Sequence, residues 1–184
     1  KEEKILKKMG IKSKYIFYVG NAHPHKNVEG LIKAYLLLRK KYSDLSLVLS
    51  GYDHYFWQRI KKDYKYEGII YTGYIYDEEL VALYKNASSF VMPSFEEGFG
   101  IPLLEAMACS TPVVSSNVGA LSEVGGNACL YFDPHNSEDM IDKISQVLNN
   151  EKLRKDLIEK GKMRVKQFSW EKLAKETLRI YESV

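Results

Sequence analysis

A glycine loop flanked by two carboxylates is the segment of this sequence best suited to chemistry. It runs through Glu97, Gly98, Phe99 and Gly100, and Glu105 follows eight positions after Glu97, about two turns along a predicted helix. Two glycines let the backbone approach a ligand, and the free N–H groups at a helix start attract anions. Many α/β proteins open a helix with such a loop and bind nothing. The two carboxylates favour a ligand with hydroxyl groups, such as a sugar or a ribose.

A second loop, residues 20–27, carries Lys26 directly before a predicted helix. The ammonium group and the helix N-terminus could act together on one anion, although a solvated lysine at a helix start has the same sequence. His23 and His25 could suggest a metal. Pro24 separates them, however, and no Cys or carboxylate stands nearby at a suitable spacing, so we expect no metal site.

Several familiar motifs are missing from the sequence. Gly98-Phe99-Gly100 lacks the third glycine of a dinucleotide fingerprint, which disfavours a nicotinamide-dependent enzyme. There is neither a phosphate-binding P-loop nor the strand-to-helix serine turn of a hydrolase. Cys109 and Cys129 fit small packed hydrophobes in a reducing compartment, and we expect a cytoplasmic protein.

Composition narrows the class of protein further. The chain has 184 residues, is 45% hydrophobic and 28% charged, and is therefore able to bury a core. Its net charge of +3 gives no reason to expect nucleic acid. No apolar run approaches the roughly 18 residues of a membrane span. Basic residues crowd positions 152–166, interrupted by acidic ones, and we interpret them as a solvated helix face rather than a membrane-binding patch.

Strands and helices must position these loops. Short runs that are apolar on both faces predict strands at 15–19, 45–50, 69–71, 90–92, 113–115 and 129–132. Helices are predicted after Asn27 and Asp77 as N-caps, at 103–108, at 138–148 and from Trp170 to Tyr181. This alternation predicts an α/β, Rossmann-like, three-layer fold: a parallel β-sheet with helices on both faces. Ligands bind such sheets at the carboxyl ends of the strands, where both loops lie.

With these residues in view, the chain resembles a known family. Residues 15–184 are similar to the C-terminal, donor-binding domain of retaining glycosyltransferases of the GT-B fold, in group 1 (GT4). The first loop resembles that of mannosyltransferases. The resemblance rests on Gly20, Lys26-Asn27, Gly73, Asp77-Glu78-Glu79-Leu80, Pro93-Ser94, Glu97-Gly98-Phe99-Gly100, Glu105-Ala106-Met107-Ala108, Thr111-Pro112-Val113-Val114, Glu123-Val124 and Phe168-Ser169-Trp170. Glu97 and Glu105 match the family's pair of glutamates with seven residues between them.

The resemblance implies a role for each part of the site. Lys26 would bind the donor diphosphate and Glu97 the hydroxyls of the donor sugar, and these two are the candidate catalytic residues. Glu105 would hold the ribose. The implied substrate-binding residues are Gly20, Asn21, Lys26, Gly51, Gly73, Tyr74, Ile75, Glu97, Gly98, Phe99, Gly100, Ile101 and Glu105.

Three positions depart from the family pattern. Asn21 stands where many relatives carry an arginine that binds phosphate, which leaves less positive charge in the loop. Ser110 replaces a glycine, and Ser122 replaces a proline. We expect the fold to tolerate the serine at a turn at modest cost.

By the same resemblance, the donor is a GDP- or UDP-sugar, with GDP-mannose favoured, and the acceptor is a glycan or a lipid-linked molecule in polysaccharide assembly. No cofactor and no essential metal are expected. The missing partner is the N-terminal GT-B domain of the same polypeptide, with residues 1–14 as the approach to it. The isolated domain would then be inactive, and contact with the inner membrane face would be peripheral. The alternative is a non-catalytic nucleotide- or carbohydrate-binding module of the same fold.

Overall fold

A six-stranded parallel sheet forms the centre of the structure, a computed structural model that describes residues 1–183. Its strands are β1 (Tyr15–Val19), β2 (Ser46–Ser50), β3 (Ile69–Gly73), β4 (Ser89–Met92), β5 (Val113–Ser116) and β6 (Cys129–Phe132). Their order is β3-β2-β1-β4-β5-β6, and neighbours pair in parallel. All six predicted strands are confirmed, within two residues at each end. The order reverses between β1 and β4, so the switch point lies between these two strands.

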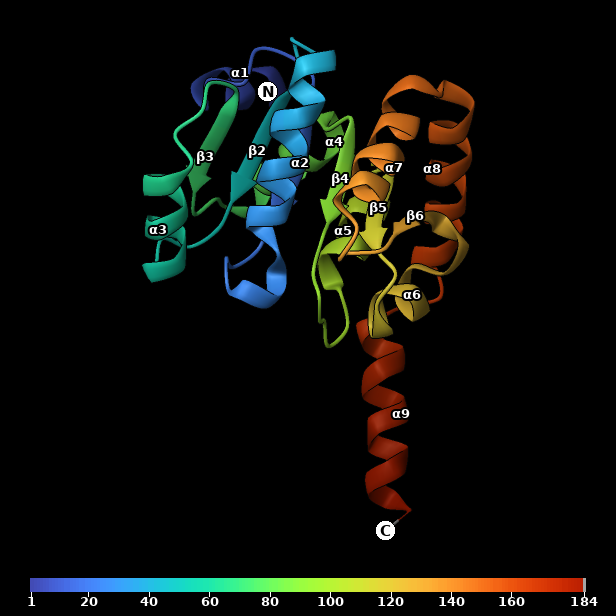
Figure 1. Cartoon of the computed structure of the whole chain (residues 1–184). Coiled ribbons are helices and arrows are strands. Elements are labelled where there is room, and N and C mark those ends of the chain that lie inside the picture. Colours follow the sequence, from blue (N-terminus) through green and yellow to red (C-terminus); the bar gives the residue numbers. More distant parts are fainter. Residues whose placement is uncertain (184) are drawn as a thin grey trace.

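Helices cover both faces of the sheet, which confirms the predicted Rossmann-like fold class (Figure 1). They are α1 (Glu2–Lys8), α2 (Val28–Lys41), α3 (Tyr55–Asp63), α4 (Asp77–Asn86), α5 (Ile101–Ala108), α6 (Gly119–Gly125), α7 (Ser137–Asn149), α8 (Glu151–Val165) and α9 (Trp170–Glu182), with short 3₁₀ turns at Pro24–Lys26 and Gly126–Ala128. The sequence pattern does not predict the helices α1, α3 and α6. Each is at most nine residues long and buries three residues at most, so its apolar periodicity is weak.

Alternate residues of β1 show how the two layers are held. Ile16 and Tyr18 point to one core, which α2, α3 and α7 complete, whereas Tyr15 and Phe17 point to the other, which α4, α5 and α6 complete. All four side chains are buried. Both faces of the strand must therefore be apolar, and this is the pattern from which the strand was predicted.

Both predicted N-caps differ in the structure. Asn27 occupies the cap position of α2 in a left-handed conformation, with φ of 53°, but its side chain does not cap the helix. Asp77 is already the first residue of α4, and Tyr76 is the cap residue, with Glu79 accepting a hydrogen bond from the Tyr76 N–H. The side chain of Asn27 is engaged elsewhere because it ties two loops together.

The first residues of the chain form a helix that packs on the domain. The side chain of Glu2 accepts hydrogen bonds from Lys85 (3.1 Å) and Asn86 (3.2 Å) of α4. Leu6 and Met9 pack against the core on that side. That residues 1–14 approach another domain stays a prediction.

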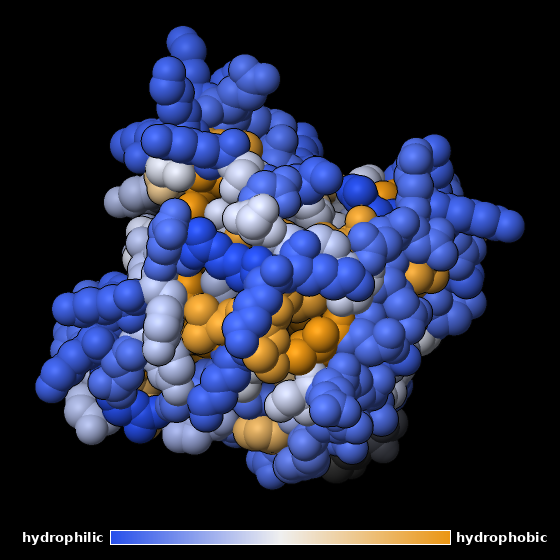
Figure 2. All heavy atoms as spheres, turned by 45° about the horizontal axis from the view of Figure 1, so that its top comes forward, coloured by the Kyte–Doolittle hydropathy of each residue, from blue (hydrophilic) through white to orange (hydrophobic). Residues whose placement is uncertain are grey.

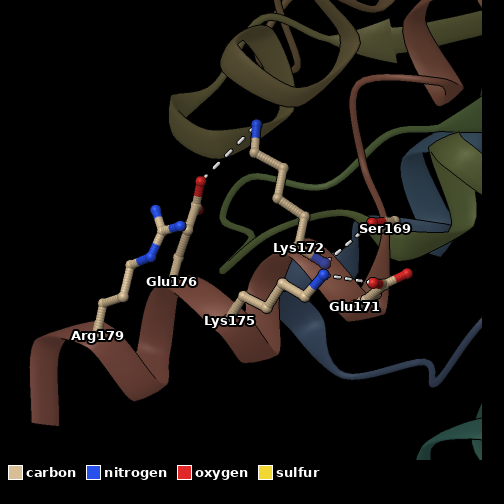
Figure 3. Close-up of a pocket in the computed structure, with 6 residues that line it drawn as sticks. All are labelled: Ser169, Glu171, Lys172, Lys175, Glu176 and Arg179. Atoms are coloured by element: carbon tan, nitrogen blue, oxygen red, sulfur yellow. Dashed lines mark hydrogen bonds and ion pairs between the residues drawn. The ribbon is translucent and has the colours of Figure 1, made fainter. Parts of the chain in front are cut away.

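Helix α9 extends away from the rest of the domain (Figure 1) and has no buried residue. Its apolar residues Trp170 and Tyr181 are about three-quarters exposed, at 75% and 74%. Charged residues such as Lys172 and Lys175 line another side, where they pair with Glu176 and Glu171 (Figure 3). Among residues 1–183, no helix is both long and apolar enough to cross a membrane.

The basic residues of 152–164 lie on α8, three of them in ion pairs with acids of the same helix, and Lys166 follows as its C-cap. Lys155 and Lys160 form i,i+4 ion pairs with Glu151 and Asp156, both at 2.6 Å.

Figure 2 brings the top of Figure 1 forward and shows that hydrophilic residues dominate this top face around a central hydrophobic patch. The strand arrows of Figure 1 point away from this face, so the loops of interest lie at the opposite edge.

Ser110 stands where the family pattern has a glycine, and it adopts the left-handed conformation that a glycine favours, with φ of 60°. We expect Ser110→Gly to raise the free energy of unfolding by about 0.5–1 kcal/mol, because relief of backbone strain outweighs the greater entropy of the unfolded glycine chain. Urea unfolding would measure the change. Ser110→Ala keeps the Cβ and should give no gain, and a loss of stability in the glycine variant would contradict the strain argument.

Candidate functional site

The loops that follow β1 and β4 meet at the switch point of the sheet. The N–H of Phe95 donates to the carbonyl of His25 at 2.7 Å. The side-chain amide of Asn27 donates to the carbonyls of Pro93 (3.1 Å) and Pro134 (3.4 Å). These bonds explain why Asn27 does not cap its own helix, and they join the two loops that the sequence singled out.

Lys26 and Glu97 form an ion pair between these loops. Lys26 Nζ lies 2.7 Å from Glu97 Oε1, and the same oxygen accepts a hydrogen bond from Ser94 Oγ at 3.0 Å. The side chains are only 16% and 9% exposed. Glu97 Oε2 accepts no hydrogen bond from residues 1–183. The pair therefore offers a free carboxylate oxygen to a hydroxyl group and ammonium N–H groups to an anion.

The glycine loop leads into α5 with fewer free amides than the sequence suggested. Gly100 is left-handed, with φ of 96°. Pro102 has no N–H, and the N–H of Leu103 already donates to the Gly100 carbonyl at 3.0 Å. The expectation of a fully unpaired helix start is therefore wrong. The amides of residues 98–101 do remain without a partner in the described chain, so Gly98, Phe99, Gly100 and Ile101 still offer N–H groups.

Glu105 lies one turn into α5, not two, because the helix begins at Ile101. Its Oε2 accepts a hydrogen bond from the hydroxyl of Tyr84 at 2.9 Å. Burial and the neighbouring carboxylate raise the pKa of Tyr84 well above its ordinary value, so the hydroxyl stays a donor. The structure thus gives Glu105 a partner of its own, separate from the ion pair of Lys26 and Glu97.

The remaining predicted residues line the same edge of the sheet, after β1, β2 and β3. Gly73, left-handed at φ of 72°, has open space where a side chain would be. Tyr74 follows it and is 64% exposed, whereas Ile75 packs against the core. A side chain at Gly51 would collide with the Gly20 carbonyl and the Trp57 ring. Gly51 therefore maintains the packing of the first loop.

Residues 1–164 match the family described as glycosyl transferases group 1. The chain belongs to the group 1 glycosyltransferase family. It is 42% identical over 176 residues to the O-antigen chain mannosyltransferase B of Escherichia coli, covering 91% of this chain and 45% of that protein. It is 30% identical over 176 residues to the D-inositol 3-phosphate glycosyltransferase of Paenarthrobacter aurescens, covering 91% of this chain and 43% of that protein. The group 1 domain thus spans less than half the length of either relative.

Solved structures share its fold. Sucrose-phosphate synthase from Thermosynechococcus elongatus superposes with a TM-score of 0.83 at 24% identity, over 98% of this chain and 48% of that one. TarM superposes with a TM-score of 0.78 at 22% identity, over 92% of this chain and 35% of that one. The group 1 domain thus has the Rossmann-like half of a GT-B architecture.

Sequence reasoning missed several residues that support the site of this glycosyltransferase domain. Ser94 is named from the sequence only as part of the family resemblance, and its hydrogen bond to Glu97 is not predicted, although a polar residue at a strand end is a candidate for a site. The sequence pattern indicates only a core position for three buried aromatic residues, Tyr18, Trp57 and Tyr84. Within residues 1–183, no group of three or more His, Cys, Asp or Glu side chains is arranged to hold a metal ion. Independence of donor binding from metal stays a prediction.

Proposed function

We propose that this domain binds the nucleotide-sugar donor of a hexosyl-transferring enzyme. The observation that carries the proposal is the largely buried ion pair of Lys26 and Glu97 at the switch point of the sheet. It puts a cation for a diphosphate next to a carboxylate for sugar hydroxyls. The names of the mannosyltransferase relatives support mannose as the sugar and GDP-mannose as the favoured donor, with UDP-sugars next.

The chemistry follows from where charge develops. Departure of the leaving group from C1 of the sugar builds negative charge on the diphosphate. Lys26 and the amides of residues 98–101 would stabilise that charge from fixed positions, which is preorganised electrostatic catalysis. The free oxygen of Glu97 would hold a sugar hydroxyl and thereby orient the anomeric carbon. We propose retention of configuration: the bond from C1 to the diphosphate breaks, the acceptor hydroxyl attacks C1 from the face that the diphosphate leaves, and the hydroxyl proton passes to the departing diphosphate.

The acceptor site lies, in this proposal, in an N-terminal GT-B domain of a longer polypeptide. The relatives are about twice the length of the matched region or more, which supports a second domain. A glycan or a lipid-linked molecule would be the acceptor. The domain by itself would therefore bind the donor but transfer no sugar.

Calorimetric titration with GDP, UDP and ADP, each with and without Mg²⁺, tests the proposal. We expect saturable binding of GDP in preference to UDP and ADP, at the same affinity with and without the metal. Binding of UDP alone would change the donor class but keep the function. A strict need for Mg²⁺ would contradict the role given to Lys26. Absence of binding by all three would refute donor binding by this domain.

A further inference from the structure

Two consecutive carbonyl groups of the first loop are turned into the core. The indole Nε1–H of Trp57, on α3, donates to the carbonyl of Gly20 at 3.1 Å. The hydroxyl of Tyr18, on β1, donates to the carbonyl of Asn21 at 2.7 Å. Both aromatic side chains are buried, at 2% and 1% exposure. These donors are fixed by core packing and not by solvent.

The direction of the carbonyls sets the direction of the amides. In a planar trans peptide, the N–H points opposite to the C=O of the same unit. The N–H groups of Asn21 and Ala22 therefore point away from the Trp57 and Tyr18 side chains that hold the two carbonyls. Neither makes a hydrogen bond to any part of residues 1–183, although Ala22 is only 3% exposed. An unpaired amide in so buried a residue is uncommon, which makes it a candidate for a hydrogen bond to a partner outside the protein chain.

Neighbouring glycines keep this arrangement possible. A Cβ at Gly51 would collide with the Gly20 carbonyl and with Trp57 Nε1, the two groups that form the bond. A Cβ at Gly20 would lie 3.0 Å from the Tyr18 hydroxyl. A side chain at either glycine would therefore disturb one of the two bonds.

We propose that the N–H groups of Asn21 and Ala22 bind the diphosphate of the donor beside Lys26, and that Tyr18 and Trp57 are the residues that position them. The inference rests on the proposed donor site and adds two donors and two positioning residues to it. Successive amides that face one way form a concave anion site. Such donors fit a loop in which Asn21 offers no cationic side chain.

The charges around the first loop favour uncharged amide N–H groups as additional donors to a diphosphate. Lys26 is paired with Glu97, so its charge is partly balanced, and a diphosphate with more than one negative charge needs donors besides this lysine. Amides attract an anion without needing a counterion of their own. Burial, with the nearby Glu97 carboxylate as a second cause, raises the pKa of Tyr18 well above its ordinary value. Its hydroxyl therefore stays protonated and donates throughout the physiological range.

The test is a titration of the ¹⁵N-labelled domain with inorganic pyrophosphate, followed by amide NMR signals, beside calorimetry with GDP and guanosine. We expect the signals of Asn21 and Ala22 to move on saturation. Tyr18→Phe removes one hydroxyl and should weaken pyrophosphate and GDP about fivefold, with guanosine affinity unchanged. Trp57→Phe is the second variant and should act in the same way.

Tyr35→Phe is the matched control, because the buried Tyr35 hydroxyl also donates to a backbone carbonyl, that of Leu45, at 3.0 Å. It should leave all three affinities unchanged. If GDP binds but the two amide signals stay in place, or Tyr18→Phe behaves like Tyr35→Phe, the inference is overturned and the donor site stands. If the wild-type domain binds neither pyrophosphate nor any of GDP, UDP and ADP, both the inference and the proposed function fail.

Discussion

Lys26→Met is expected to lower the free energy of unfolding by about 3 kcal/mol and the affinity for GDP about 100-fold. Among residues 1–183, the variant leaves the carboxylate of Glu97, 9% exposed, with the Ser94 hydroxyl as its single partner. The substitution also removes the ammonium group that is proposed to bind the diphosphate. Urea unfolding and calorimetric titration of the same preparation measure the two effects.

A double variant separates stability from binding. In Lys26→Met/Glu97→Gln neither position carries a charge. Most of the lost stability should therefore return, while GDP binding stays weak. Recovery of binding together with stability would show that Lys26 acts on the fold alone. A double variant as unstable as the single one would contradict the burial argument for Glu97.

Glu105→Ala is expected to weaken GDP about 30-fold, because the ribose loses its hydrogen bonds to a charged acceptor. The affinity for 2′,3′-dideoxy-GDP should stay the same, since that ligand has no ribose hydroxyls to lose. Calorimetry with both nucleotides measures the difference. Equal losses for the two ligands would mean that the substitution acts through the packing of α5 and not through the ribose.

Tyr84→Phe is the control for this substitution. It removes the hydroxyl that donates to Glu105 and keeps the ring contacts with Phe17 and Phe90. Glu105 keeps its charge, so we expect GDP affinity to change by no more than about threefold. A loss as large as that of Glu105→Ala would assign the ribose contact to the tyrosine.

Most of the strands were predictable because both of their faces are buried, whereas β3, at one edge of the sheet, is only half-buried. The run Tyr15–Val19 is apolar throughout, and its bounds are those of β1. Helix α3 could not be found in this way, since Trp57 and Ile60 are its only buried residues. The two loops were predictable as site loops because parallel strands end at one edge of a sheet.

The side-chain contacts of the site were beyond the sequence. Lys26 and Glu97 are 71 residues apart, and nothing local shows that they pair. Their contact depends on β1 lying beside β4, which is a property of the strand order. The bonds from Trp57 and Tyr18 to loop carbonyls leave no pattern either, because buried aromatic residues look alike whether or not their polar atom has a partner.

The pairing of β1 with β4 also has a kinetic consequence. β1 pairs directly with β4, although β2 and β3 come between them in sequence, so this junction closes a longer stretch of chain than the β1–β2 or β4–β5 pairing. Closing a long loop costs entropy before its contacts form, and parallel pairing over long separations folds slowly. Refolding should restore most helical signal first and nucleotide binding last, with the slowest phase. A chain arrested before β1 pairs with β4 would have most of its helices formed but would lack the donor site.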